Sequence, residues 1–301
     1  MKSERTRHAV VLVKQVPDTH NISGDVMKED GTINRSALPA IFNPEDLNAL
    51  EMALQFRERY GGTVTVVTMG PASASEVLRE SLYRGADRVV LLSDRRFAGA
   101  DTLATSYTLK CAVEKLGPVD LVFCGRQAID GDTAQVGPQT AEKLGIPQIT
   151  YAESIVSLEG DEIVVQRGLP LGREWVKTTL PCLLTVAASA NRPRPASVRK
   201  RIEHKLAATP LEHKTMLTRW PEFKTEQELE AYLTAHDLKI PLWTADDVGA
   251  EADKLGLHGS PTQVHKVNFV VLESTESKEF RADAEGIAAL MQELVKEYMG
   301  G

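Results

Sequence analysis

The stretch Asp120–Tyr151 constrains the fold of this 301-residue chain more than any other part of its sequence. It opens with a short apolar run, Leu121–Cys124, whose length and composition predict a strand buried on both faces of a sheet. A loop rich in glycine and aspartate follows at Gly125–Asp132. A helical pattern then runs over Thr133–Leu144, and the glycine and proline just after it are typical of a helix end. The stretch therefore predicts one strand–loop–helix unit of an α/β protein.

A strand, a glycine-rich loop and a helix start in this order can bind an anion. Backbone N–H groups are free at the helix start, and the helix dipole adds partial positive charge there. Gly125 and Gly131 have no Cβ, so a phosphate can approach the backbone closely. Thr133 could cap the helix or donate its hydroxyl to a phosphate oxygen. The same pattern also fits a capped strand–helix turn without a ligand, so the motif alone leaves both interpretations open.

Four separated segments of the chain together resemble the β subunits of electron transfer flavoproteins. The loop sequence from Gly125 to Thr133 resembles the nucleotide-binding signature of that family, and Gln135 and Pro138 extend the match. Three further segments occur in the same order as in the family: Val11–Asp18, Asn43–Glu51 and Leu255–Thr262. The resemblance covers most of residues 8–190 and returns near residues 246–267.

Strands and helices alternate up to residue 147, which predicts an α/β fold with a Rossmann-like parallel sheet and helices on both faces. Ala9–Val13 is predicted as the first, central strand. Four short β-rich runs then predict an antiparallel β extension: Gln148–Leu158, Glu162–Arg167, Glu174–Thr179 and Cys182–Ala187. Further on, Val264–Leu272 is expected to form one more strand and Arg281–Met299 a terminal helix.

The chain is expected to have three parts. Residues 1–190 form the α/β domain, which the resemblance implies is nucleotide-binding. Residues 191–271 form a partner-binding C-terminal arm with an inserted helical segment, and residues 272–301 hold the C-terminal helix.

The cofactor site is expected where strands end and helices begin, because ligands collect at these places in parallel α/β sheets. The resemblance implies that residues there hold the adenylate and phosphates of a nucleotide. The residues expected to bind the cofactor are Leu12, Asn43, Pro44, Asp46, Met69, Asp101, Thr102, Gly125, Arg126, Gln127, Asp130, Gly131, Asp132, Thr133, Gln135 and Val136.

Several of these residues also have an ordinary structural explanation. Asn43 could only cap the helix that follows, whereas the family places this turn against the ribose and base. Asp101 could likewise be a helix cap or part of the ligand wall. Met69 could fill a gap in the core or pack on the nucleotide. Arg126 could form a surface salt bridge or stabilise negative charge on a flavin or diphosphate.

Composition excludes several classes of function. The net charge of −7 argues against nucleic-acid binding, and no apolar run approaches the ~18 residues that cross a bilayer. No GxGxxG, no GxxxxGK[ST] and no zinc-type histidine spacing occurs, so no standard dinucleotide fingerprint, P-loop or zinc site is predicted.

Cys111, Cys124 and Cys182 lie far apart and are expected to be buried thiols in a reducing compartment. The N-terminus is too short and polar for a signal peptide, so a cytoplasmic protein is predicted.

A proline-rich and basic segment follows the core at Asn191–Ile202. Such a run is typical of a solvated linker, whereas the resemblance implies an arm that reaches the redox partner. In the second interpretation, Arg199, Lys200 and Arg201 contact that partner. The resemblance gives no role to the insert at Pro210–Leu242.

The resemblance implies a subunit that works in a heterodimer. In the family, the α subunit holds an FAD, and the pair passes electrons between dehydrogenases and carriers. One subclass of β subunit holds AMP as a structural element. The other holds a second FAD, which accepts a hydride from NADH so that the two electrons are divided between acceptors, a process called electron bifurcation. Gly131 and the segments Asn43–Glu51 and Phe97–Thr102 resemble the second subclass.

The chain is accordingly expected to bind FAD, with AMP as the alternative, and to meet NADH as a transient substrate. The expected partners are the α subunit, an acyl-CoA-type or other flavin dehydrogenase, and ferredoxin or flavodoxin. No side chain is expected to act as an acid or base, because the flavin carries out the redox chemistry. Two alternatives stay open: an AMP-binding β subunit that shuttles electrons from acyl-CoA dehydrogenases, and a stand-alone adenine-nucleotide-binding module. The long C-terminal arm disfavours the second.

Overall fold

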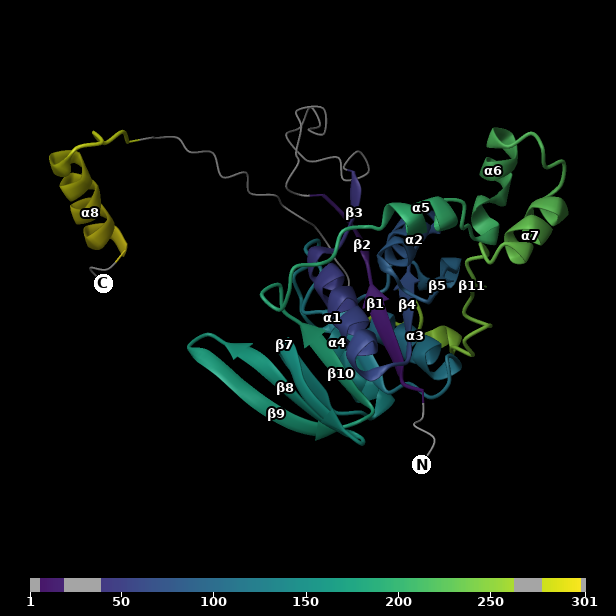
Figure 1. The fold of residues 1–301 in the computed structure, drawn as a ribbon, viewed down its shortest axis with the longest axis horizontal. Helices are drawn as coiled ribbons and strands as arrows, with labels where there is room; N and C mark the ends of the chain where they lie inside the picture. Colours follow the sequence, from purple (N-terminus) through teal and green to yellow (C-terminus); the bar gives the residue numbers. More distant parts are fainter. Residues whose placement is uncertain (1–5, 19–38, 263–277, 299–301) are drawn as a thin grey trace. The chain divides into compact units, whose positions relative to one another are not determined.

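The computed structural model describes residues 6–18, 39–262 and 278–298. Packing divides the chain into two compact units, Met1–Val264 and His265–Gly301. Among the described residues, the first unit holds a nine-stranded sheet in the order β11-β5-β4-β1-β6-β10-β7-β8-β9 (Figure 1). The predicted strand Val264–Leu272 lies outside the described residues.

The sheet has a parallel part and an antiparallel part. Its parallel strands are β1 (His8–Val13), β4 (Thr63–Met69), β5 (Arg88–Leu92), β6 (Leu121–Gly125), β7 (Gln148–Glu159), β10 (Cys182–Val186) and β11 (Leu242–Trp243). The strands β8 (Glu162–Leu169) and β9 (Gly172–Thr179) follow β7 in antiparallel order. A separate antiparallel pair joins β2 (Gln15–Pro17) to β3 (Ala40–Phe42).

Helices follow most of the strands. Those of the first unit are α1 (Pro44–Tyr60), α2 (Ser75–Arg84), α3 (Thr102–Lys115), α4 (Val136–Leu144), α5 (Val198–His204), α6 (His213–Arg219) and α7 (Glu226–Ala235). The second unit contains α8 (Ala284–Tyr298).

Both faces of the parallel sheet are covered, and alternate residues of β1 show the division. Val11 belongs to the apolar cluster that includes Leu50 and Leu54 of α1. Its neighbour Val10 points to the opposite face and belongs to the cluster that includes Ala112 of α3. All of these side chains are almost fully buried, because successive side chains of a strand point to opposite faces of a sheet. The predicted Rossmann-like α/β fold is confirmed.

The strand predicted at Cys182–Ala187 takes an interior place in the sheet. It forms β10, which lies between β6 and β7 and is parallel to both, so the antiparallel part is confined to β7, β8 and β9. All five residues of β10 are buried. A strand without exposed positions requires neighbours on both edges and cover on both faces, which only the interior of the sheet provides.

Two helices begin later than the sequence predicts. The helix predicted from Thr133 begins at Val136, because Asp132 and Ala134 have φ values of 49° and 52°, outside the right-handed helical region. The terminal helix predicted from Arg281 begins at Ala284.

The segment after residue 190 includes buried as well as exposed residues. α5 packs on α2, and Leu229 and Leu233 of α7 are fully buried. After α7, the chain returns to the sheet and adds β11 beside β5. The insert at residues 210–242 therefore has a structural role that the sequence did not predict: its last residue begins the strand that extends the sheet beside β5.

In the second unit, α8 carries apolar side chains at helical spacing. Ile287, Leu290, Met291, Leu294 and Val295 are all exposed, which is one amphipathic face left uncovered by the described residues of that unit, 278–298.

Gly137 tests how tightly α4 packs on the sheet. A Cβ at this position would lie 2.7 Å from Cys124 Sγ and 2.9 Å from the side chain of Thr185. Gly137→Ala should therefore lower the free energy of unfolding by about 1–3 kcal/mol through overpacking. Gly131→Ala is the matched control, because a Cβ there meets no atom within 4 Å. Urea denaturation of both variants measures the difference, and equal midpoints would contradict the prediction.

Candidate nucleotide-binding site

The loop between β6 and α4 is held from outside by side chains at the start of α1. Asn43 precedes α1 but makes no side-chain cap hydrogen bond with it. Its amide instead donates to Gln127 O (2.9 Å) and accepts from Ile129 N (3.1 Å). The Asn43 side chain is fully buried, so both polar ends of the amide are satisfied by the loop backbone. The structure thus shows Asn43 fixing the loop rather than capping its own helix.

Asp46 joins the ends of two neighbouring strands. Its carboxyl accepts from Gly125 N (2.9 Å), at the end of β6, and from Lys14 N (2.8 Å), just after β1. Burial raises the pKa of Asp46 to about 7, although these two hydrogen bonds oppose the shift. A carboxyl group that ionises near neutral pH therefore lies beneath the loop.

Glu45 holds the first residues of the loop. It forms an ion pair with Arg126 (2.8 Å) and accepts from Gln127 N (3.0 Å). Glu45 is buried, whereas the Arg126 side chain is about one-third exposed. The salt bridge considered for Arg126 therefore exists, and the partner of Arg126 is the buried carboxylate of Glu45. This ion pair fixes the direction of the Arg126 guanidinium group.

The acidic residues of the loop also have partners. Lys14 Nζ forms an ion pair with Asp130 (2.7 Å), and Gln127 Nε2 donates to Asp132 (2.8 Å). The Lys14 ammonium offsets negative charge at a place where an anion is expected to bind, whereas the neutral Gln127 amide only supplies a hydrogen bond.

The two glycines of the loop differ in what they do. At Gly125, a Cβ would lie 2.5 Å from Asp46 Oδ1 and 2.7 Å from the backbone of Glu45. Glycine is therefore required there for close packing against α1, and the approach of a phosphate to Gly125 stays a prediction. At Gly131, a Cβ would meet nothing within 4 Å, and no positive φ is recorded. Gly131 faces open space, as a close approach by a ligand requires.

The start of α3 lies beside the start of α4. Asp101 caps α3 by accepting from Leu103 N (2.9 Å) and Ala104 N (3.0 Å), so the capping interpretation is correct. Thr102 Oγ1 donates to Gln135 Oε1 (3.0 Å) and so links the two helix starts.

The segment Leu255–Thr262 supports the same helix start. Ser260 Oγ accepts from Asp101 N (2.8 Å), and Thr262 Oγ1 donates to the Asp101 carboxylate (2.7 Å). Phe97–Thr102 and Leu255–Thr262, two segments that resemble the family and lie far apart in the sequence, therefore meet at Asp101.

The remaining predicted residues have simple surroundings. Leu12 is buried, and Met69 is half-buried, in the apolar cluster beneath α3. Pro44 is the first residue of α1 and Val136 the first of α4. Thr133 is exposed and caps no helix. Contact of these residues with a nucleotide stays a prediction.

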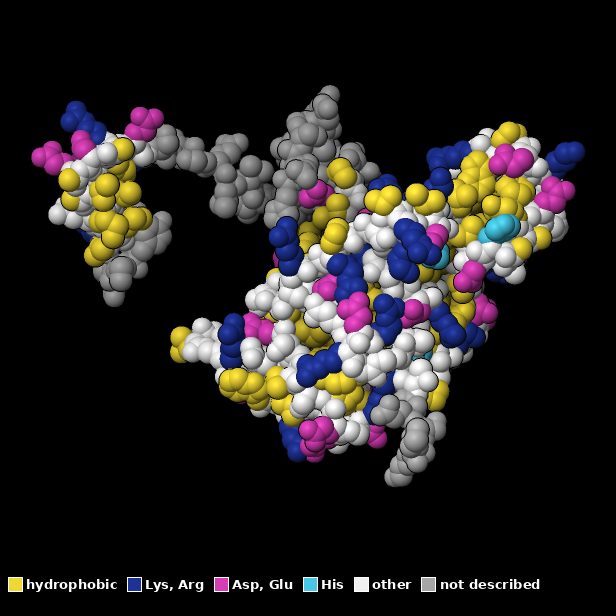
Figure 2. Space-filling view, in the orientation of Figure 1, with side chains coloured by type: hydrophobic (Ala, Val, Ile, Leu, Met, Phe, Trp, Pro, Cys, Tyr) yellow, Lys and Arg dark blue, Asp and Glu magenta, His cyan; other side chains and the backbone are white. Residues whose placement is uncertain are grey.

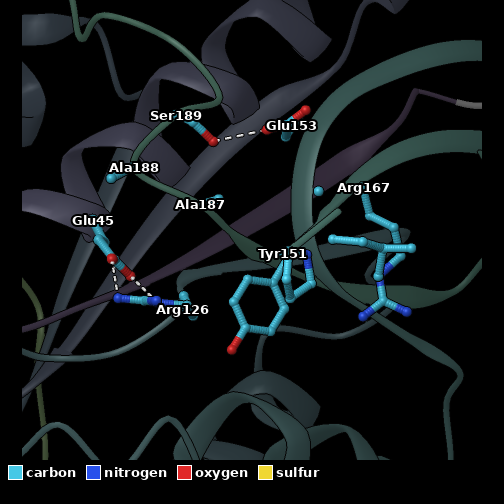
Figure 3. A pocket seen from close by; sticks show the side chains of 11 residues that line it. Glu45, Arg126, Tyr151, Glu153, Arg167, Ala187, Ala188 and Ser189 are labelled. Carbon is cyan, nitrogen blue, oxygen red and sulfur yellow. Dashed lines mark hydrogen bonds and ion pairs between the residues drawn. The ribbon is translucent and has the colours of Figure 1, made fainter. Parts of the chain in front are cut away.

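Arg126 also lines an open cavity of about 670 Å³ (Figure 3). Arg126, Tyr151 and Arg167 line it together with Glu45 and Glu153. Figure 3 shows the Tyr151 ring between the two arginines, and the Arg126 guanidinium lies 5.7 Å from the ring centroid, within the range of a cation–π contact.

The backbone of Tyr151 is unusual. Its φ is 56°, a conformation that a bulky residue rarely adopts. It lies at an irregularity of β7 opposite β10, where its N–H donates to Thr185 Oγ1 (3.2 Å). This bulge directs the Tyr151 ring into the cavity.

Sequence reasoning missed several residues of this site. Lys14, Glu45 and Ser260 lie inside the segments that resemble the family, so their positions carried a signal. Tyr151 and Arg167 carried none, because they line the cavity beside Arg126 from β7 and β8, whose place in the sheet depends on long-range strand order. Arg199, Lys200 and Arg201 are not part of the site and lie on α5.

No group of three or more His, Cys, Asp or Glu side chains is placed to hold a metal ion within residues 6–18, 39–262 and 278–298. Cys111, Cys124 and Cys182 are free and buried, as expected, and burial raises the pKa of Cys182 to about 12. No helix in the described part of the chain is both long and apolar enough to span a membrane.

A Rossmann-like sheet with a glycine-containing loop between the starts of three helices is typical of nucleotide-binding proteins. The model of the electron transfer flavoprotein domain matches residues 30–210. The chain belongs to the electron transfer flavoprotein family, as a β subunit. β subunits of this family pair with an α subunit.

Three relatives illustrate the similarity. The β subunit of the electron transfer flavoprotein of Clostridium acetobutylicum is 45% identical over 85% of this chain and 86% of its own length. Subunit CarD of the caffeyl-CoA reductase–Etf complex of Acetobacterium woodii is 42% identical over 85% of this chain and 86% of its own length. Protein FixA of Azorhizobium caulinodans is 43% identical over 86% of this chain and 83% of its own length.

Asn43→Ala tests whether the loop depends on its buried amide. The variant leaves Gln127 O and Ile129 N without their partner, which should lower the free energy of unfolding by about 1–3 kcal/mol. It should also accelerate hydrogen exchange at Ile129, measured by NMR. Thr133→Ala, in the same loop but exposed, is the control and should change neither quantity. A protected Ile129 amide in the Asn43 variant would contradict the assignment.

The pKa of Asp46 predicts a pH dependence of stability. Because folding raises this pKa from 3.8 to about 7, the folded state holds the proton more tightly than the unfolded chain. The stability that Asp46 contributes is therefore complete below pH 3.8 and is lost as the pH rises through 7. The free energy of unfolding of the parent chain minus that of Asp46→Asn should fall over this range by at most about 1.4 kcal/mol per pH unit. Parallel pH profiles for the two proteins would rule this out.

Proposed function

We propose that this β subunit binds FAD at the loop between β6 and α4 and that the bound flavin is the entry point for electrons from NADH. When bound, FAD supplies the redox chemistry, accepting a hydride and passing electrons through the FAD of the α subunit to a dehydrogenase and to a low-potential carrier. The observation that carries the proposal is the loop itself, which α1 holds from outside while Gly131 faces open space.

The residues fit a dinucleotide in three ways. The diphosphate would lie beside Gly131 near the start of α4, where free N–H groups and the helix dipole favour negative charge. Lys14 already offsets the charge of Asp130. Arg126, fixed by Glu45, is placed to stabilise a further negative group.

Space for more than an adenylate supports FAD over AMP. The cavity beside Arg126 has a volume of about 670 Å³, which lies within the usual range of roughly 300–1,000 Å³ for a small-molecule site. Its aromatic and guanidinium groups suit a planar ring system that carries negative charge when reduced. We infer that this cavity receives the isoalloxazine ring.

The comparisons add support for a partner enzyme. One relative is a subunit of a complex that contains caffeyl-CoA reductase, so we propose that the present chain also works beside an acyl-CoA-type or other flavin dehydrogenase. Ferredoxin or flavodoxin is the proposed low-potential carrier. The three free, buried cysteines suit a reducing compartment, and we propose the cytoplasm.

The cofactor content of the heterodimer tests the proposal. Co-purified α and β subunits should hold two FAD per pair and little AMP, and NADH added without oxygen should bleach the β flavin. Gly131→Leu should remove the β flavin and its bleaching by NADH, because the side chain would fill the space where the diphosphate is expected. The fold should persist, since no atom of the chain lies within 4 Å of a Cβ at this position.

Gly131→Ala is the size control and should retain part of the β flavin. The FAD of the α subunit should remain in every variant. One FAD and one AMP per pair, with no bleaching by NADH, would show an AMP-binding subunit instead. Full FAD occupancy in Gly131→Leu would place the diphosphate elsewhere.

A further inference from the structure

The chain that follows β11 lies along the loop between β5 and α3. Ala245 N donates to Asp94 Oδ2 (3.1 Å) at the start of this loop. Further along the chain, Leu257 N donates to Ala98 O (2.9 Å), near the end of the same loop. Residues 244–262, the strap, are therefore fastened to the loop at separate points.

The final residues of the strap hold Asp101. Ser260 Oγ accepts from Asp101 N (2.8 Å) and donates to Gly256 O (2.6 Å), which belongs to the strap itself. Ser260 is only 8% exposed, so its hydroxyl is fixed between two buried partners. Thr262 donates to Asp101 Oδ2 through both its N (3.1 Å) and its Oγ1 (2.7 Å). Backbone and side chain of Asp101 are therefore both bound by the strap.

The two carboxylate oxygens of Asp101 have different partners. Oδ1 accepts from Leu103 N and Ala104 N and so caps α3, whereas Oδ2 accepts from Thr262. Burial opposes ionisation of Asp101, but the hydrogen bonds from Thr262, Ala104 and Leu103 outweigh it and hold its pKa below the ordinary value. Because the strap and the start of α3 share one carboxylate, a change at Thr262 also acts on the start of α3.

The contact continues from α3 to α4. Thr102 Oγ1 donates to Gln135 Oε1 (3.0 Å), at the residue before α4. One turn further along each helix, Ser106 Oγ lies 3.4 Å from Gln139 Oε1. The start of α4, beside which the diphosphate is proposed to lie, is therefore placed in part by the start of α3.

The position of these helix starts matters because the chain has little general positive charge to attract an anion. Its net charge is −7, and Figure 2 shows basic and acidic side chains interspersed over the visible face of the first unit. Backbone N–H groups bind a phosphate only where they converge on it. The affinity for a phosphate should therefore depend on how firmly the helix starts are held.

We propose that Ser260 and Thr262 are positioning residues for the nucleotide: by holding Asp101, they fix the starts of α3 and α4 against which its phosphates lie. The proposal rests on the proposed function, which puts a nucleotide at the loop between β6 and α4. The segment Leu255–Thr262, which holds none of the residues predicted to bind the cofactor, thereby acquires a role in binding it.

The test measures nucleotide affinity in the co-purified heterodimer, with the FAD of the α subunit retained and the β nucleotide removed. Thr262→Val keeps the shape of the side chain but removes its hydroxyl, and Ser260→Ala removes the acceptor of Asp101 N. Both variants should raise the dissociation constants for added FAD and for added AMP about tenfold, which corresponds to about 1.4 kcal/mol. Quenching of flavin fluorescence measures the binding of FAD, and calorimetry measures that of AMP.

Hydrogen exchange of the nucleotide-free heterodimer reports on the contact itself. The amides of Asp101, Leu103 and Ala104 should exchange about tenfold faster in both variants, because the cap of α3 is loosened. The amide of Gly125, which Asp46 binds from α1, is the internal control and should keep its exchange rate.

Two matched variants separate positioning from general damage. Thr262→Ser retains the hydroxyl, and His258→Gln changes an exposed residue of the strap; both should bind FAD and AMP as the parent does. Unchanged dissociation constants in Thr262→Val and Ser260→Ala would overturn the proposal, even if exchange became faster. An equal loss of affinity in Thr262→Ser and Thr262→Val would also overturn it. If the parent binds AMP but not FAD, the proposed function fails, while the AMP affinities still decide whether the strap positions the nucleotide.

Discussion

The structure depends on the polar side chains at the start of α1 and on the need to satisfy them away from water. Asn43, Glu45 and Asp46 are all buried, and each finds its partners in the loop after β6 or at the end of a strand. An unpaired buried amide or carboxyl would be costly, so helix, loop and strand ends can only form together. The loop is therefore shaped before any ligand arrives, which lowers the cost of binding.

α1 also separates two tasks along its length. Its apolar side packs on the sheet through Leu50 and Leu54, its first residues hold the loop, and Glu51 holds the arm through Arg194. A helix is suited to this because residues on different sides of it face different neighbours at fixed spacing. One rigid element thus connects the proposed cofactor site to the segment that leads to α5.

Charge at the site is balanced locally. The loop carries Asp130 and Asp132, which would repel a diphosphate, but Lys14 and Gln127 engage their carboxylates. Arg126 is held by Glu45 and faces the cavity rather than solvent alone. The protein as a whole has a net charge of −7, so the proposed binding of an anionic cofactor would rely on these fixed groups and on backbone N–H groups, not on overall charge.

The sequence by itself determined the class of fold and the position of the loop, because alternating buried strands and amphipathic helices are local patterns. The strand Leu121–Cys124, the helix after Asn43 and the cap at Asp101 could all be predicted in this way. Only the tertiary structure decided which side chains hold the loop. Asn43 could have capped its own helix, but the packing of α1 against β6 makes the loop its partner, and the same packing requires glycine at position 125. Tyr151 and Arg167 line the cavity beside Arg126 from β7 and β8, and the long-range strand order that sets the place of these strands leaves no local pattern in the two residues.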